Sequence, residues 1–134
     1  MRNAIIFLDS GDTLVDESTE VRIKGDVVDH AEFFTGIKEV LFQLKNAGFR
    51  VALVADGLVE SFDNIYQQHE METYFEVRAI SETVGVCKPA GEMFKTAMEK
   101  MNLEEADKKY IIMIGNNLER DIVGANRMGI TSVL

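Results

Sequence analysis

The chain has 134 residues, 46% of them hydrophobic and 28% charged, which is the composition of one ordinary globular domain over residues 1–134. Its formal charge of −9 argues against nucleic acid or an anionic membrane surface as a partner. No run approaches the ~18 apolar residues of a membrane span. No signal peptide opens the chain and Cys87 is the only cysteine, so we expect a cytoplasmic protein.

The first predicted element is a strand over residues 4–8, AIIFL, a continuous apolar run typical of a strand buried on both faces. Residues 16–33 fit no helix. There the apolar stretches VRI and VV flank KGD and predict a small hairpin, or flap, over the first strand. The acidic run at 16–20 is interpreted as a solvated face of that flap. A helix follows, with apolar residues at helical spacing from Ile37 to Leu44 and an end at Gly48.

Strands and helices alternate over the rest of the chain. Apolar runs predict strands at 51–55, 77–80, 110–114 and 130–134, and apolar residues at helical spacing predict helices around 58–65, 94–101 and 118–125. Strands that alternate with helices are joined by right-handed crossovers, which produce a parallel sheet with helices on both faces. The predicted fold is therefore a three-layer, Rossmann-like α/β domain with a five-stranded parallel sheet.

Polar residues gather where the predicted strands end, which is the edge where such sheets bind ligands. They are Asp9, Gly11, Asp12 and Thr13 after the first strand, Asp56 and Gly57 after the second, Lys88 after the third, and Asn116 and Asp121 after the fourth. Carboxylate and amide oxygens suit Mg²⁺, and a lysine can hold a phosphate oxygen as a point charge. Each residue alone is compatible with a turn, a helix cap or a solvated loop. Their conjunction in one fold favours a site for Mg²⁺ and phosphate.

The order of these motifs resembles the haloacid dehalogenase superfamily, whose members are mostly Mg²⁺-dependent phosphohydrolases. The similarity covers essentially the whole chain. The corresponding stretches are DSGDT (9–13), VALVADG (51–57), VCKPA (86–90) and IIMIGNNLERD (111–121). The connections are short, so the resemblance implies a core without a cap domain. It also implies a small phosphorylated substrate or a phosphoprotein as the partner, with a homo-oligomer as one way to cover an open site.

The resemblance assigns a role to each candidate residue. Asp9 would attack phosphorus and form an aspartyl-phosphate, which divides one displacement into two. Mg²⁺ would contact Asp9, the Gly11 carbonyl oxygen and Asn116, with Asp121 as a direct or water-mediated support. Lys88 would neutralise charge on the nucleophile and the transferring group. The remaining candidates would orient Asp9 and the phosphate; they are Thr13 and the backbone around Ala55, Asp56 and Gly57.

Three positions depart from the family pattern. Gly11 stands where the family has the aspartate that protonates the leaving group, and Asp12, one residue further on, is the adjacent candidate to replace it. General acid–base catalysis typically contributes ~10²–10⁴ in rate, so its loss predicts a slow enzyme or one restricted to activated phosphates. Ala55 replaces a phosphate-binding Ser or Thr, which removes a hydrogen bond worth about 1–3 kcal/mol. Asn116 replaces a metal-binding Asp, which predicts weaker Mg²⁺ binding.

These departures leave alternatives open. A non-catalytic relative that binds Mg²⁺, a phosphorylated ligand or a protein has the same architecture. A dehalogenase is a second alternative, because those relatives also lack an aspartate two residues after the nucleophile, although they usually carry a helical lid. A phospho-accepting receiver domain is rejected, because Lys88 is mid-chain and no aspartate ends the third predicted strand.

Overall fold

A computed structural model describes residues 3–134 of the chain. The strands are β1 (Ile5–Leu8), β2 (Val15–Val21), β3 (His30–Phe33), β4 (Arg50–Ala55), β5 (Val77–Ile80), β6 (Ile111–Ile114) and β7 (Thr131–Val133). The α-helices are α1 (Ile37–Asn46), α2 (Val59–Gln68), α3 (Ser81–Val84), α4 (Gly91–Lys100) and α5 (Gly124–Arg127). A 3₁₀ helix, η1, covers Glu105–Tyr110, and a π-helical segment, η2, covers Leu118–Val123.

The main sheet has five strands in the order β5-β4-β1-β6-β7, and every neighbouring pair is parallel. All five predicted strands are present, and the prediction of a parallel α/β fold is confirmed. β1 is the central strand, and all four of its residues are buried because helices cover both faces of the sheet. This burial explains why β1 and β4 are continuous apolar runs rather than alternating ones.

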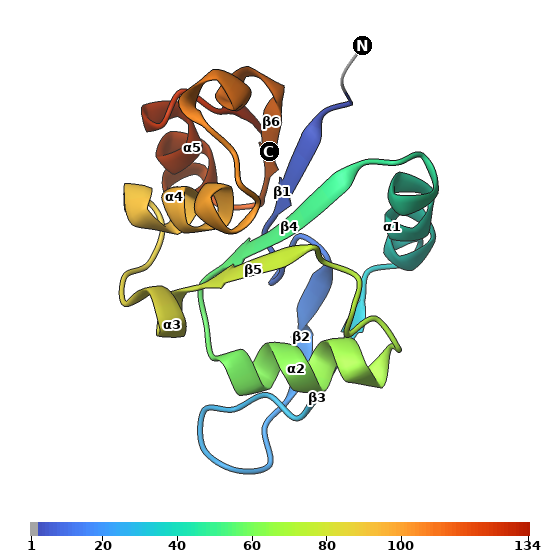
Figure 1. The fold of residues 1–134 in the computed structure, drawn as a ribbon. Coiled ribbons are helices and arrows are strands. Elements are labelled where there is room, and N and C mark those ends of the chain that lie inside the picture. Colours follow the sequence, from blue (N-terminus) through green and yellow to red (C-terminus); the bar gives the residue numbers. More distant parts are fainter. Residues whose placement is uncertain (1–2) are drawn as a thin grey trace.

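Helices cover both faces of the sheet (Figure 1), and a hydrophobic core lies under the helices of each face. Ile6 and Leu8 of β1 point to the face covered by α1 and α2, whereas Ile5 and Phe7 point to the face covered by α4 and α5. Side chains alternate along a strand, so one strand supplies both cores. α1 ends as the sequence predicts, with Gly48 in the left-handed region at φ +87°, a conformation that glycine adopts without a steric penalty.

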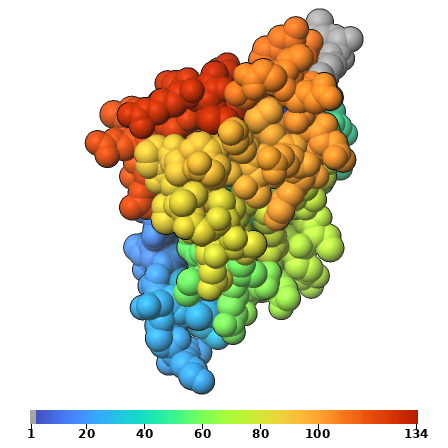
Figure 2. Space-filling view, turned by 60° about the vertical axis from the view of Figure 1, so that its left-hand side comes forward, coloured from blue at the N-terminus to red at the C-terminus, as the bar shows by residue number. Residues whose placement is uncertain are grey.

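Between β1 and α1, residues 15–33 form a two-stranded antiparallel hairpin made of β2 and β3. The pairs Val15–Phe33 and Asp16–Glu32 lie further from the turn than VRI and VV, which the sequence pattern indicated. Of those two stretches, Val21 pairs with His30 and Val27 with Lys24. The pairing is irregular between Asp16 and Val21. In the space-filling view this blue segment forms the lower projection of the molecule (Figure 2). Among residues 3–134, no helix has the length and apolar character to cross a membrane.

Candidate active site

Asp9 is the first residue beyond the central strand β1, and the loop that follows turns sharply around Ser10. The Ser10 carbonyl oxygen accepts hydrogen bonds from the backbone N–H groups of Thr13, Leu14 and Val15 at 3.2, 2.8 and 3.0 Å. The Ser10 hydroxyl shares a buried 2.8 Å hydrogen bond with the hydroxyl of Tyr66 on α2. The loop is therefore anchored to a helix, and it holds Asp9 at the carboxyl edge of the sheet.

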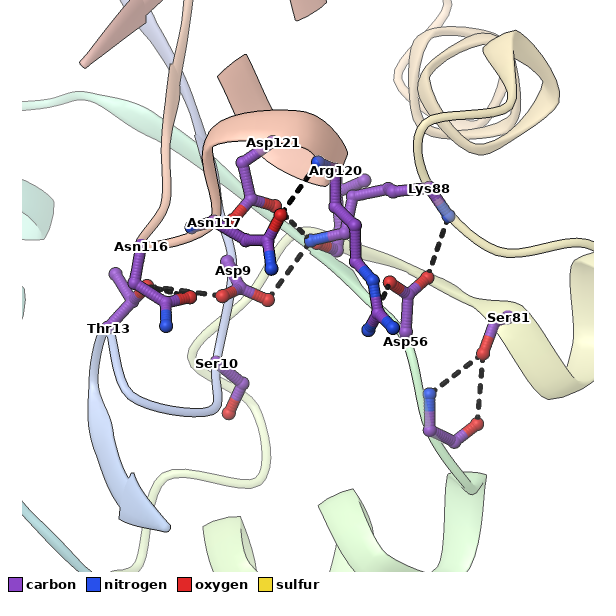
Figure 3. A network of polar contacts seen from close by, with 12 residues as sticks. Asp9, Ser10, Thr13, Asp56, Ser81, Lys88, Asn116, Asn117, Arg120 and Asp121 are labelled. Carbon is purple, nitrogen blue, oxygen red and sulfur yellow. Dashed lines mark hydrogen bonds and ion pairs between the residues drawn. The ribbon is translucent and has the colours of Figure 1, made fainter. Parts of the chain in front are cut away.

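Lys88 reaches Asp9 from the loop before α4, and its side chain is 1% exposed. Its ammonium Nζ donates to Asp9 Oδ1 at 3.0 Å, to the Val54 carbonyl oxygen at 2.8 Å and to Asp121 Oδ1 at 2.5 Å. An ammonium has three protons to donate, so Lys88 is fully satisfied in this position. Figure 3 shows its nitrogen between the two carboxylates. The structure thus brings together three of the predicted site residues in one buried ion cluster.

Asp121 lies in η2 and is 1% exposed. Its second oxygen, Oδ2, accepts the backbone N–H of Asn117 at 3.0 Å. Asn117 in turn caps the start of η2, because its Oδ1 accepts the N–H of Arg120 at 2.9 Å. Both oxygens of Asp121 therefore have protein partners, and its direct effect is to position Lys88.

Gly115, at the end of β6, leaves the room that Asp121 occupies. A Cβ atom at residue 115 would lie 2.3 Å from both Cγ and Oδ2 of Asp121, far closer than real contacts. We expect Gly115→Ala to lower the free energy of unfolding by about 1–3 kcal/mol, the usual cost of overpacking. The midpoint of urea unfolding measures this loss. An unchanged midpoint would show that Asp121 does not lie against Gly115.

Asn116 and Thr13 lie on the other side of Asp9 (Figure 3). Thr13 Oγ1 donates to Asp9 Oδ2 at 3.1 Å. One end of the Asn116 amide lies 2.9 Å from Asp9 Oδ2 and 3.3 Å from the Gly11 carbonyl oxygen, so it faces two acceptors. With the amide nitrogen at this end, Asn116 donates to both oxygens. A rotation of the amide by 180° would bring its oxygen beside the Asp9 carboxylate and the Gly11 carbonyl oxygen, and three oxygens of these kinds suit a hard cation.

The residues after β4 have separate tasks. Asp56 Oδ1 accepts the backbone N–H of Lys88 at 2.9 Å, which fixes the lysine loop, and Asp56 Oδ2 lies 3.7 Å from Arg120 Nη1. Ala55 is 1% exposed and belongs to the core. The N–H of Gly57 donates to Ser81 Oγ at 2.8 Å, so this predicted phosphate donor already has a partner.

A cavity of about 170 Å³ opens above Asp9, which is the liquid volume of about five or six water molecules. Four carboxyl groups and two cationic groups line it: Asp9, Glu17, Glu20, Asp56, Lys88 and Arg120. Asp12 and Thr13 are not among the lining residues. The carboxylates outnumber the cations, so the cavity favours a cation and repels a bare phosphate.

Sequence reasoning missed Glu17, Glu20 and Arg120. The run at 16–20 was interpreted as a solvated face, yet Glu17 and Glu20 both line the cavity. Two residues three positions apart lie on opposite faces of a regular strand. The irregular pairing between Asp16 and Val21 allows both side chains to face the cavity. Arg120 carried no motif signal.

Burial raises the pKa of two carboxyl groups of the site, Asp9 and Glu17. Burial raises the pKa of Asp9, although the nearby Lys88 ammonium opposes this rise. Partial burial also raises the pKa of Glu17, and the carboxylates of Asp12 and Glu20 add to the shift. Asp9 thus sits where an added positive charge would stabilise its ionised form.

The comparisons with known proteins agree with this architecture. Residues 9–134 match the family model of haloacid dehalogenase-like hydrolases. The glyceraldehyde 3-phosphate phosphatase of Pyrococcus abyssi is 33% identical over 99 residues, which cover 73% of this chain and 40% of that protein. The enzyme of the same name from Pyrococcus furiosus is 31% identical over 116 residues, which cover 81% of this chain and 47% of that protein.

The crystal structure of a HAD phosphatase from Thermococcus onnurineus has a TM-score of 0.79 over 96% of this chain and 84% of that chain, at 14% identity. At that identity the likeness shows the fold alone. The family match covers most of the chain, and the chain belongs to the haloacid dehalogenase-like hydrolase family. It spans less than half the length of the two curated relatives.

Proposed function

We propose that this domain is a Mg²⁺-dependent phosphohydrolase that works through an aspartyl-phosphate on Asp9. The observation that carries this proposal is the position of Asp9: it lies at the carboxyl end of the central strand, lines the cavity and has Lys88 Nζ 3.0 Å from its carboxylate. Family membership and the phosphatase names of the two curated relatives support the same reaction class.

In the first step a carboxylate oxygen of Asp9 attacks phosphorus, and the bond between phosphorus and the leaving oxygen breaks. In the second step water attacks the aspartyl-phosphate and releases inorganic phosphate. Lys88 stabilises the negative charge that gathers on the nucleophile and the phosphoryl oxygens. Thr13 holds the Asp9 side chain through its 3.1 Å hydrogen bond, so the nucleophile is oriented before substrate arrives.

The groups that would hold Mg²⁺ are the Asp9 carboxylate, the Gly11 carbonyl oxygen and the Asn116 amide oxygen, with Asp121 as a support through Lys88 and the Asn117 backbone. The bound ion would offset the excess of carboxylates and attract a phosphate oxygen. The sulfur-free donor set of two neutral oxygens and one carboxylate suits a hard cation.

The substrate we propose is a small phosphorylated metabolite. A cavity of about 170 Å³ accepts a phosphoryl group with a small organic part, so a larger substrate would extend past its mouth. The hairpin supplies Glu17 and Glu20 to the cavity wall, and we propose that it acts as the flap over the site. Both curated relatives are named for a phosphorylated triose, which makes sugar phosphates the first class to screen.

The experiment is an assay of purified protein with para-nitrophenyl phosphate or acetyl phosphate. We expect turnover with Mg²⁺ and none after the metal is removed with EDTA. Stabilisation by Mg²⁺ and phosphate without any turnover would instead favour a non-catalytic binding domain.

Mg²⁺ should also stabilise the fold. We expect the free energy of unfolding to rise with Mg²⁺ concentration, by about 2.7 kcal/mol at 100 times Kd. Asn116→Ala removes one proposed ligand and should shift this dependence to higher concentration. Asn126→Ala, an exposed asparagine on α5 whose side chain contacts Ser132, is the matched control. Equal responses in the two variants would remove Asn116 from the metal site.

A further inference from the structure

Gly11 has no side chain, and another residue fills the space beside it. A Cβ atom built at residue 11 would lie 2.8 Å from both Cδ and Oε1 of Glu17 and 3.1 Å from its Cγ. The carboxyl group of Glu17 therefore occupies the place into which a side chain at residue 11 would extend. It comes from β2, six positions along the chain, and it lines the same cavity as Asp9.

The loop after Asp9 fixes β2 in this place. The Asp12 N–H donates to the Val15 carbonyl oxygen at 2.6 Å, and residues 11 and 15 form a β-bridge. The Asp12 carboxylate then accepts the backbone N–H of Glu17 at 2.9 Å. Asp12 adopts a left-handed φ of +56° in this arrangement. Asp12 is thus directed to the hairpin backbone, and its contact places Glu17 rather than the substrate.

The other carboxyl groups of the cavity have cationic or backbone partners. Glu20 Oε1 accepts from Arg22 Nη2 at 3.0 Å. Asp56 accepts the Lys88 N–H at 2.9 Å and lies 3.7 Å from Arg120. Among the ion pairs of residues 3–134 none includes Glu17. Of the cavity carboxyls other than Asp9, Glu17 is therefore the one that no cationic side chain holds among the described residues, and it lies beside Gly11, two residues after the nucleophile.

We propose that Glu17, and not Asp12, is the general acid and base of the hydrolysis, an inference that rests on the proposed phosphohydrolase function. As Asp9 forms its bond to phosphorus and the ester P–O bond breaks, the Glu17 carboxylic acid gives its proton to the leaving oxygen. The resulting carboxylate then takes a proton from the water that attacks the aspartyl-phosphate. Phosphate leaves, and both the Glu17 acid and the Asp9 carboxylate are restored.

The test compares Glu17→Gln with wild type on two substrates. Glycerol phosphate has an alkoxide leaving group that needs a proton, so we expect its turnover to fall about 10²–10⁴-fold. Para-nitrophenolate leaves without a proton, so the first step should survive while the second becomes slow. We therefore expect a burst of about one nitrophenolate per enzyme in the variant, with the phosphoenzyme visible by intact mass. A purely structural role would not produce this burst.

Glu32→Gln is the matched control, because it removes the same charge from β3 outside the cavity. A second set of variants moves the acid to residue 11. The double variant Gly11→Asp, Glu17→Ala should turn over glycerol phosphate faster than Glu17→Ala does. Gly11→Asp alone crowds two carboxyl groups and should be no faster than wild type. Two results would overturn the role of Glu17 but not the proposed function: wild-type rates in Glu17→Gln, or equal losses on both substrates without a phosphoenzyme. Wild type no faster than Asp9→Asn would overturn the proposed function with it.

Discussion

Replacing Asp9 by asparagine is expected to abolish phosphate release while leaving the fold intact. An amide cannot form the acyl phosphate, so the rate with para-nitrophenyl phosphate should fall at least ~10³-fold, the scale of loss when a nucleophile is removed. Stability should not fall, because burial raises the pKa of Asp9, so the folded chain gains no stability from the charge that the variant removes. Lys88 keeps its pair with Asp121 in the variant.

Initial rates with Mg²⁺ and the midpoint of urea unfolding measure the two effects separately. Asp16→Asn is the matched control, because Asp16 accepts hydrogen bonds from Ser18 on the hairpin and does not line the cavity. It should keep wild-type turnover. An Asp9→Asn protein that still forms a phosphoenzyme would place the nucleophile elsewhere and refute the aspartyl-phosphate on Asp9.

The sheet could be predicted because burial controls its sequence. Strands covered on both faces have few polar positions, so AIIFL and VALVA stand out, and shorter apolar runs also located the edge strands β5 and β7. The hairpin was expected between residues 16 and 33, but its strands were located only in part, because β2, VDESTEV, has only one buried residue and no apolar period. α3 and η1 were missed because helices of one or two turns show no helical period.

The part of the site that could be predicted from the sequence is the part that lies directly after the strands. Asp9 and Asn116 meet because β1 and β6 are parallel neighbours, and Lys88 reaches them from the loop before α4 across β4, where it donates to the Val54 carbonyl oxygen. The partner of the Gly57 N–H could not be predicted, because Ser81 reaches it from the end of another strand. Glu17 could not be placed either, since its direction depends on an irregular strand pairing. The sequence did contain one indication of the position of Glu17: Gly11, two residues after Asp9, has no side chain, and an acidic residue follows six positions later.

Lys88→Met is expected to be the most destabilising change at the site. It leaves the buried carboxylates of Asp9 and Asp121 without their cation, and removing one partner of a buried ion pair costs about 3–5 kcal/mol. Turnover should also fall about 10²–10³-fold, because the group that stabilises the transferring charge is gone. Urea unfolding and initial rates measure both. Lys95→Met, at an exposed position of α4, is the control for a lysine lost outside the cluster.

Stability and activity should separate in the double variant Lys88→Met, Asp121→Asn. In Lys88→Met the Asp121 carboxylate is 1% exposed and has lost its cation. Its replacement by a neutral amide removes that buried charge, so most of the lost free energy of unfolding should return. The rate should not return, because an asparagine at 121 supplies no positive charge beside Asp9. If the second substitution recovers no stability, the cost of losing Lys88 does not come from Asp121. If it recovers the rate, Lys88 acts on the reaction only by balancing Asp121, and its proposed contact with the phosphoryl group is refuted.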